Sequence, residues 1–111
     1  YNLGGGSSNY GAPNSGISRF KFLDSTVSVI SATLSSSLSL LGGASNNTYG
    51  VTSLGYNGGS NVSSTDKMTF SNESISAGTS YSGGADSFVI SASSSTAGYF
   101  AAGSNNRLVR N

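Results

Sequence analysis

The acidic side chains are the first candidates for chemistry, because the chain contains no histidine and no cysteine. The acids are Asp24, Asp66, Glu73 and Asp86. Their spacing predicts no close carboxylate pair of the kind that cleaves glycosidic bonds. Serines are abundant, but a nucleophilic serine needs a base, and the remaining candidates, Lys21 and Lys67, are expected on exposed strand faces. The sequence therefore predicts that the protein is not an enzyme.

Residues 81–88 offer a second candidate, a metal site. With two glycines just before Asp86, they resemble the end of a calcium-binding nonapeptide repeat, in which glycine-rich turns present an aspartate to the ion. Calcium needs six or more oxygen ligands from successive turns, and one copy with a single carboxylate does not provide them. We therefore expect Asp86 to be a solvated turn residue, with no bound metal and no cofactor.

Tyrosines and asparagines offer a third candidate, sugar recognition. Aromatic rings stack on sugar faces, and turns rich in Asn, Ser and Tyr on a surface with little charge suit contact with a glycan. Two tyrosines, Tyr49 and Tyr99, fall in predicted strands, where we expect them in the core. Others lie nearer loops, and the predicted glycan-contact residues are Tyr10, Tyr56, Asn57 and Asn61.

The composition excludes several other classes of partner. Charged residues are 8% of the chain, against about 25% in an ordinary domain. The net charge of +1 provides no electrostatic footprint for nucleic acid or anionic lipid. No segment approaches the roughly 20 apolar residues of a membrane span, so no membrane insertion is expected. Regularly placed aromatic and aliphatic residues nevertheless predict an ordered, all-β chain.

An internal repeat organises the elements that must position these residues. Shifting the chain along itself without a gap, so that residue 1 lies on residue 49, aligns apolar positions with apolar positions. The shift places residues 17–22 on 65–70, 27–28 on 75–76, 39–41 on 87–89 and 44–48 on 92–96. We call this shift the repeat period. A period of this length is typical of solenoids, propellers and other repeat arrays.

The most regular strand pattern covers residues 18–23. Alternation predicts Phe20 and Phe22 on the buried face and Arg19 and Lys21 on the exposed face. The second copy of the strand is expected to bury Met68 and Phe70 in the same way. Further short strands are predicted at residues 1–6, 27–29, 38–41, 49–54, 75–77, 88–90 and 98–102.

Short strands joined by Gly/Asn/Ser turns predict tandem four-stranded antiparallel repeats, arranged like the blades of a β-propeller. A β-solenoid or a cross-strand filament is the alternative. The predicted units cover residues 1–48 and 49–96. Residues 97–111 form a partial third unit, which another chain or segment is expected to complete.

The same residues resemble a known family. Residues 17–22, the Ser/Thr-rich return at 26–35 and the Tyr49-Gly50 pair resemble the kelch-like repeats of phage virion proteins and related bacterial surface proteins. In those repeats a Gly-Tyr strand start, a Gly-Gly doublet and an aromatic strand with a basic residue recur at about this spacing. The chain departs from ordinary kelch repeats in having no tryptophan. The resemblance implies a propeller-like architecture, a virion or extracellular location, and a structural or host-contacting role.

Two full units and the start of a third leave strand edges without partners. Roughly three or more units are usually needed for a stable repeat array. The chain has few charges and only one proline, Pro13, to block edge pairing. We therefore expect it to assemble with copies of itself. The predicted assembly-edge residues are Tyr1, Leu3, Tyr99, Phe100, Leu108 and Val109.

Two functional hypotheses follow. The first is a structural and adhesive repeat protein of a virion fibre or extracellular appendage, which self-assembles through β-strand edges and contacts host glycans. The alternative is a soluble, lectin-like sugar-binding module that forms a closed oligomeric propeller. Three chains of 111 residues contain nearly seven such units, so a trimer is one way to close such a ring.

Overall fold

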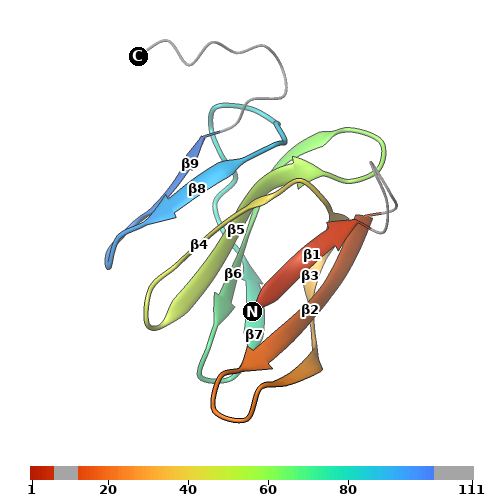
Figure 1. Cartoon of the computed structure of the whole chain (residues 1–111). Coiled ribbons are helices and arrows are strands. Elements are labelled where there is room, and N and C mark those ends of the chain that lie inside the picture. The colour runs from red at the N-terminus through yellow and green to blue at the C-terminus, as the bar shows by residue number, and fades with distance from the viewer. Residues whose placement is uncertain (7–12, 102–111) are drawn as a thin grey trace.

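The computed structural model describes residues 1–6 and 13–101. Within these residues the fold is all-β and contains no helix (Figure 1). The strands are β1 (Asn2–Gly6), β2 (Pro13–Lys21), β3 (Thr26–Leu38), β4 (Gly42–Ser45), β5 (Tyr49–Tyr56), β6 (Asn61–Thr69), β7 (Ser74–Ala77), β8 (Ile90–Ser93) and β9 (Gly98–Ala101). The prediction of an all-β fold is confirmed.

The strands form three antiparallel sheets in chain order. We call β1-β2-β3 the first sheet, β4-β5-β6-β7 the second sheet and β8-β9 the third sheet. Strands that are neighbours in each sheet are also neighbours in sequence, so the first and second sheets are meanders and the third is a hairpin. Over the described residues the sheets close into neither a barrel nor a propeller, and the arrangement as tandem blades stays a prediction.

The strand boundaries recur at the period seen in the sequence. Strands β6, β7 and β8 each begin one repeat period after the start of β2, β3 and β4, respectively. The turns repeat as well. Ser25 and Glu73 both have φ near 54°, and Leu40 and Phe88 both have φ near 56°. Residues other than glycine rarely adopt these left-handed backbone conformations. Their recurrence therefore shows that the local backbone repeats together with the sequence.

Four of the predicted strands have other bounds in the structure. The strand predicted at 18–23 is β2, which begins at Pro13 and ends at Lys21. Residues 38–41 are not one strand, because Leu38 ends β3 and Leu40 lies in a left-handed turn before β4. Likewise Phe88 precedes β8, which begins at Ile90. The predicted short strand at 27–29 instead continues to residue 38. This long strand pairs with β2 from Thr26 to Leu38, with two irregularities in register, and it buries Ile30, Leu34 and Leu38 on one face.

Strand pairing also crosses the border between the predicted units. Ala44 of β4 lies opposite Val51 of β5, so the second sheet contains residues from both sides of position 48. Because β4 and β5 are joined by only residues 46–48, the two strands form a tight hairpin. The sheets are therefore out of phase with the 1–48 and 49–96 units.

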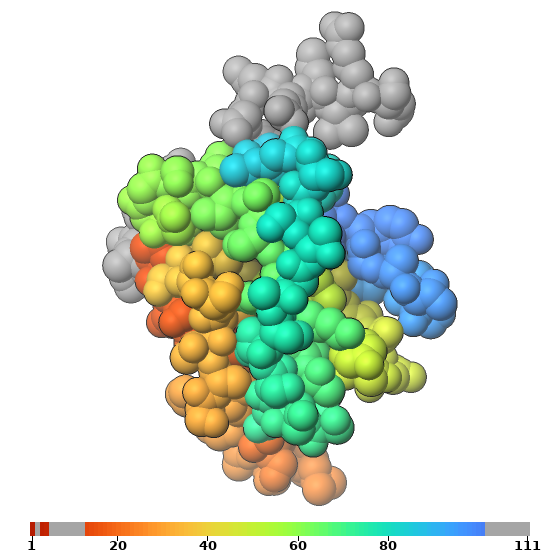
Figure 2. Space-filling model, turned by 180° about the vertical axis from the view of Figure 1, so that it is seen from behind, coloured from red at the N-terminus to blue at the C-terminus, as the bar shows by residue number. Residues whose placement is uncertain are grey.

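The main hydrophobic core lies between the first and second sheets. Its buried members are Ile17, Ile30, Leu34, Leu38 and Met68. The first four come from β2 and β3, and Met68 comes from β6, so the two sheets pack through these faces. At the rear of the molecule, β3 and β7 border one another (Figure 2). These contacts give the two sheets a shared interior.

The expected buried face of β2 is wrong, although its alternation is right. Phe20 and Phe22 are 44% and 92% exposed. Arg19 lies half-buried on the other face, the face that carries Ile17. The reason is that the first sheet uses the Ile17 face to pack on the second sheet. In the second sheet the prediction holds for Met68, which is 0% exposed.

The third sheet packs on β4. A Cβ added at Gly42 would lie 2.5 Å from Val89 and 3.0 Å from Phe100, so only glycine allows this close approach. Serines of β8 bond to the backbone of β4. The Ser91 hydroxyl accepts from the Gly43 amide at 3.1 Å, and the Ser93 hydroxyl accepts from the Ser45 amide at 2.9 Å. Serine hydroxyls of β8 thus accept hydrogen bonds from backbone amides of β4, the strand that lies one repeat period earlier.

Candidate functional site

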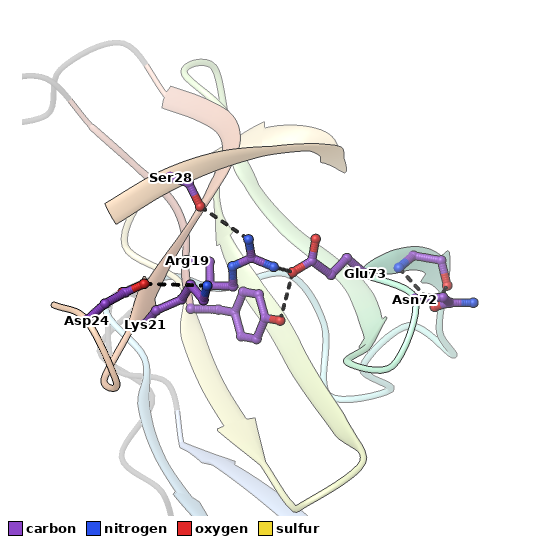
Figure 3. A network of polar contacts seen from close by, with 8 residues as sticks. Arg19, Lys21, Asp24, Ser28, Asn72 and Glu73 are labelled. Carbon is purple, nitrogen blue, oxygen red and sulfur yellow. Dashed lines mark hydrogen bonds and ion pairs between the residues drawn. The ribbon is translucent and has the colours of Figure 1, made fainter. Parts of the chain in front are cut away.

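A cluster of four side chains joins the first sheet to the second. We call Tyr1, Arg19, Phe70 and Glu73 the inter-sheet cluster. The Tyr1 and Phe70 rings stack with centroids 5.2 Å apart and an interplanar angle of 6°. Arg19 forms an ion pair with Glu73, and the Tyr1 hydroxyl donates to Glu73 Oε1 at 3.1 Å (Figure 3). Aromatic stacking and a charged pair therefore meet at one contact.

The turn between β6 and β7 positions Glu73. Asn72 Oδ1 accepts from the Ser74 amide at 3.2 Å and from the Ser74 hydroxyl at 2.7 Å, which closes the turn. Asparagine favours this geometry because its side chain bonds to the backbone two residues ahead. Burial, followed by the nearby Glu73 carboxylate, raises the pKa of the Tyr1 hydroxyl. Tyr1 therefore stays a neutral donor, as the hydrogen bond to Glu73 requires.

A second pair of residues repeats half of this cluster. Tyr49 and Lys67 lie one repeat period after Tyr1 and Arg19, and we call them the Tyr49–Lys67 patch. Lys67 Nζ lies 3.6 Å from the centroid of the Tyr49 ring, a cation–π contact. Tyr49 is nevertheless 36% exposed. The patch borders a groove of about 250 Å³, whose opposite wall is the β8–β9 hairpin.

Three of the predicted glycan-contact residues lie at one hairpin. Tyr56 ends β5 and faces Asn61 at the start of β6. Asn57 Oδ1 accepts from the amides of Gly59 and Ser60 at 3.0 and 2.9 Å, so this oxygen closes the turn. Tyr56 is half-buried. The fourth predicted residue, Tyr10, lies outside the described residues.

The predicted assembly-edge residues divide between two edge strands. Tyr1 and Leu3 lie at β1, but Tyr1 belongs to the inter-sheet cluster and Leu3 packs against the core. Tyr99 and Phe100 lie on β9, where Tyr99 is 60% exposed. Leu108 and Val109 lie outside the described residues. Tyr49 and Tyr99 are strand residues as predicted, but their exposure contradicts the expected core positions.

The acids differ most from expectation. Asp86 is 5% exposed rather than a solvated turn residue. Its carbonyl accepts from the Gly55 amide at 2.8 Å, which ties it to β5. Asp66 is 2% exposed and accepts from the amide and hydroxyl of Ser35 at 2.9 and 3.0 Å. Residues 1–6 and 13–101 contain no group of three or more acidic, histidine or cysteine side chains that would hold a metal.

Sequence reasoning missed the role of Asp66, although a signal was present. Asp66 and Met68 alternate along β6 and must share a face. Because Met68 was expected to be buried, the same alternation places Asp66 in the interior. A buried carboxylate needs hydrogen bonds, and Ser35 of the facing sheet donates two.

No protein-family model matches the chain, and no curated protein sequence matches it. In the part of the chain that the structure describes, no helix has the length and apolar character to cross a membrane.

Proposed function

We propose that the chain is a structural and adhesive repeat protein of a virion fibre or another extracellular appendage, and that it assembles with copies of itself through strand edges. The unequal sheets carry this proposal. The second sheet has four strands, whereas the described residues give the first sheet three and the third sheet two. Among the described residues, strands equivalent to β4 in the first sheet and to β6 and β7 in the third sheet are not present.

The outer face of the first sheet supports the same proposal. Its exposed apolar residues are Phe20, Val27 and Val29, and Phe22 of the following turn contacts Phe20 edge to face. Three of their counterparts one repeat period later, Met68, Phe70 and Ile75, are buried in the core or packed against it. Large apolar side chains gathered on one exposed face are a feature of interaction sites. Another copy of the chain would cover this face of the first sheet, as the first sheet covers the equivalent face of the second.

The edge strand β9 is the second support. It pairs with β8 alone among the described strands. Its residues Gly98–Ala101 contain no proline and no charge, the features that normally protect an edge from pairing. An edge of this type accepts a further strand from another chain.

Concentration-dependent mass is the expected result for this function. Light scattering after size exclusion should give a mass that rises with concentration and a broad distribution of species. Tyr99→Lys should weaken the self-association by about 10-fold, because a charged side chain on an edge strand opposes pairing. A monomer at every concentration would contradict the proposal. One sharp small oligomer would instead favour the closed, lectin-like module.

Glycan contact is the adhesive part of the proposal. Tyr56, Asn57 and Asn61 combine an aromatic ring with amides at a single turn, an arrangement that suits a sugar face and its hydroxyls. Tyr56→Ala should weaken binding of the labelled protein to a glycan array by about 10-fold, the loss of one stacking contact. Circular dichroism should stay unchanged. Equal array binding by the variant and the native chain would remove Tyr56 from the site.

A further inference from the structure

The turn between β2 and β3 is a copy of the turn that contributes to the inter-sheet cluster. Phe22, Asp24 and Ser25 precede Phe70, Asn72 and Glu73 by one repeat period. Asp24 Oδ1 accepts from the amide and hydroxyl of Thr26 at 3.2 and 2.6 Å, the same two bonds that Asn72 makes with Ser74. Ser25 and Glu73 share the same left-handed φ. The two turns therefore have matching bonds and matching backbone.

The two turns differ in what they contact. Phe70 stacks on Tyr1, whereas Phe22 is 92% exposed. The Tyr49–Lys67 patch corresponds to the other half of the inter-sheet cluster. It carries the counterparts of Tyr1 and Arg19, and Lys67 lies over the Tyr49 ring beside an open groove. At 36%, Tyr49 is about as exposed as Tyr1 at 44%, so the groove and not the exposure marks the patch as a docking surface. Each copy of the chain thus presents a patch like the one bound inside the molecule and a turn with the same aromatic residue and backbone, in which Ser25 stands at the position of Glu73 and Asp24 is the neighbouring acid.

We propose that the β2–β3 turn of one copy docks on the Tyr49–Lys67 patch of a second copy, with Phe22 against Tyr49 and Asp24 beside Lys67. This inference rests on the self-association proposed above and names the surfaces that carry it. The carboxylate of Asp24 has the charge opposite to the ammonium of Lys67, and it lies one residue before Ser25, the position that Glu73 occupies in the inter-sheet cluster. The groove beside Tyr49 provides space next to the patch for the incoming turn.

The existing partners of the two charges do not prevent this exchange. Asp24 pairs with Lys21 at 3.6 Å, but both side chains are about half exposed, and such pairs contribute little. Hydrogen bonds from Thr26 hold the pKa of the Asp24 carboxyl below its ordinary value, so it is charged at neutral pH. Lys67 lies over Tyr49 at a surface site, where a cation–π contact is weak. Docking therefore replaces weak contacts with a more buried set.

The proposed contact joins two different surfaces of each copy. A contact of this type is heterologous, so copies add head to tail. The assembly becomes an open filament unless the rotation between copies closes a ring. This direction distinguishes the proposed contact from a symmetric pairing of two identical faces.

The aromatic half of the contact is tested with two neighbouring residues. Phe22→Ala should raise the dissociation constant for self-association, measured by sedimentation velocity, by about 10-fold or more. The matched control is Leu23→Ser. Leu23 is 96% exposed and as apolar, but its counterpart Ser71 is also exposed, so the control should change the constant by less than about 3-fold. Neither change is expected to alter the circular dichroism.

The charged half is tested without disturbing the turn. Asp24→Asn removes the charge but keeps the turn-closing oxygen, as Asn72 shows in the second turn. Asp24→Asn and Lys67→Met should each weaken association by about 5-fold, and the double variant should be no weaker than either single variant. Ser25→Glu places an acid at the position equivalent to Glu73. This change should strengthen association of the otherwise native chain by about 5-fold.

The outcomes separate this inference from the proposed function. If the native chain self-associates but Phe22→Ala and Leu23→Ser weaken it equally, the docking contact is wrong and the assembly proposal stands. Additive effects of Asp24→Asn and Lys67→Met would also overturn the contact. A native chain that remains monomeric throughout would overturn both proposals.

Discussion

Replacing Met68 by alanine is expected to lower the free energy of unfolding by about 3 kcal/mol. Met68 is 0% exposed and is the member of the core cluster that β6 contributes. Its truncation removes apolar contacts and leaves a cavity between the first and second sheets. The remaining side chains come from paired strands and have limited freedom to fill the space. The change is measured by urea unfolding, followed by far-ultraviolet circular dichroism.

Phe20→Ala is the matched control, because Phe20 precedes Met68 by one repeat period. Phe20 is 44% exposed, and its ring has an edge-to-face contact with Phe22 at 5.4 Å. Its truncation should cost less than about 1 kcal/mol in a dilute sample. Equal losses for the two variants would contradict the packing described for the two sheets. The comparison therefore tests whether Met68 is buried and its counterpart Phe20, one repeat earlier, is exposed.

The period and the alternation along strands were available from the sequence. The apolar matches at the repeat period predicted strands that recur at this spacing, and alternation separated Phe20 from Arg19 correctly. Both signals are local, because strand geometry alone places successive side chains on opposite faces. This is why a strand could be predicted at β2 and at β6, although β2 begins at Pro13 and ends at Lys21 instead of covering 18–23.

The alternation along β2 and β6 could not show which face of each strand is buried. Phe20 and Met68 have the same place in their strands, yet they differ in exposure because the second sheet has a sheet against that face and the first sheet has none among the described residues. The ion pair of Arg19 with Glu73 was missed for the same reason. It joins residues 54 positions apart and depends on how one sheet is placed on another.

Asp66→Ala is expected to lower the free energy of unfolding by about 2 kcal/mol. Asp66 is 2% exposed, and Oδ2 accepts from the amide and hydroxyl of Ser35 on the facing sheet. Two opposing effects decide the sign. The variant loses two hydrogen bonds to a charged group, but it also removes a carboxylate whose burial is unfavourable. We expect the first effect to prevail, because Ser35 approaches the carboxylate at normal hydrogen-bond distances.

Two further variants, Asp66→Asn and Ser35→Ala, test whether the loss of stability comes from the hydrogen bonds between Asp66 and Ser35. The asparagine variant keeps one oxygen for Ser35 and should lose about half as much stability. Ser35→Ala removes only the hydroxyl and should cost about 1 kcal/mol. Combined with Asp66→Ala it should add almost nothing, because its partner is already absent. Additive losses would mean that Asp66 stabilises the fold through other groups, and a more stable Asp66→Ala chain would mean that desolvation of the carboxylate outweighs its bonds to the first sheet.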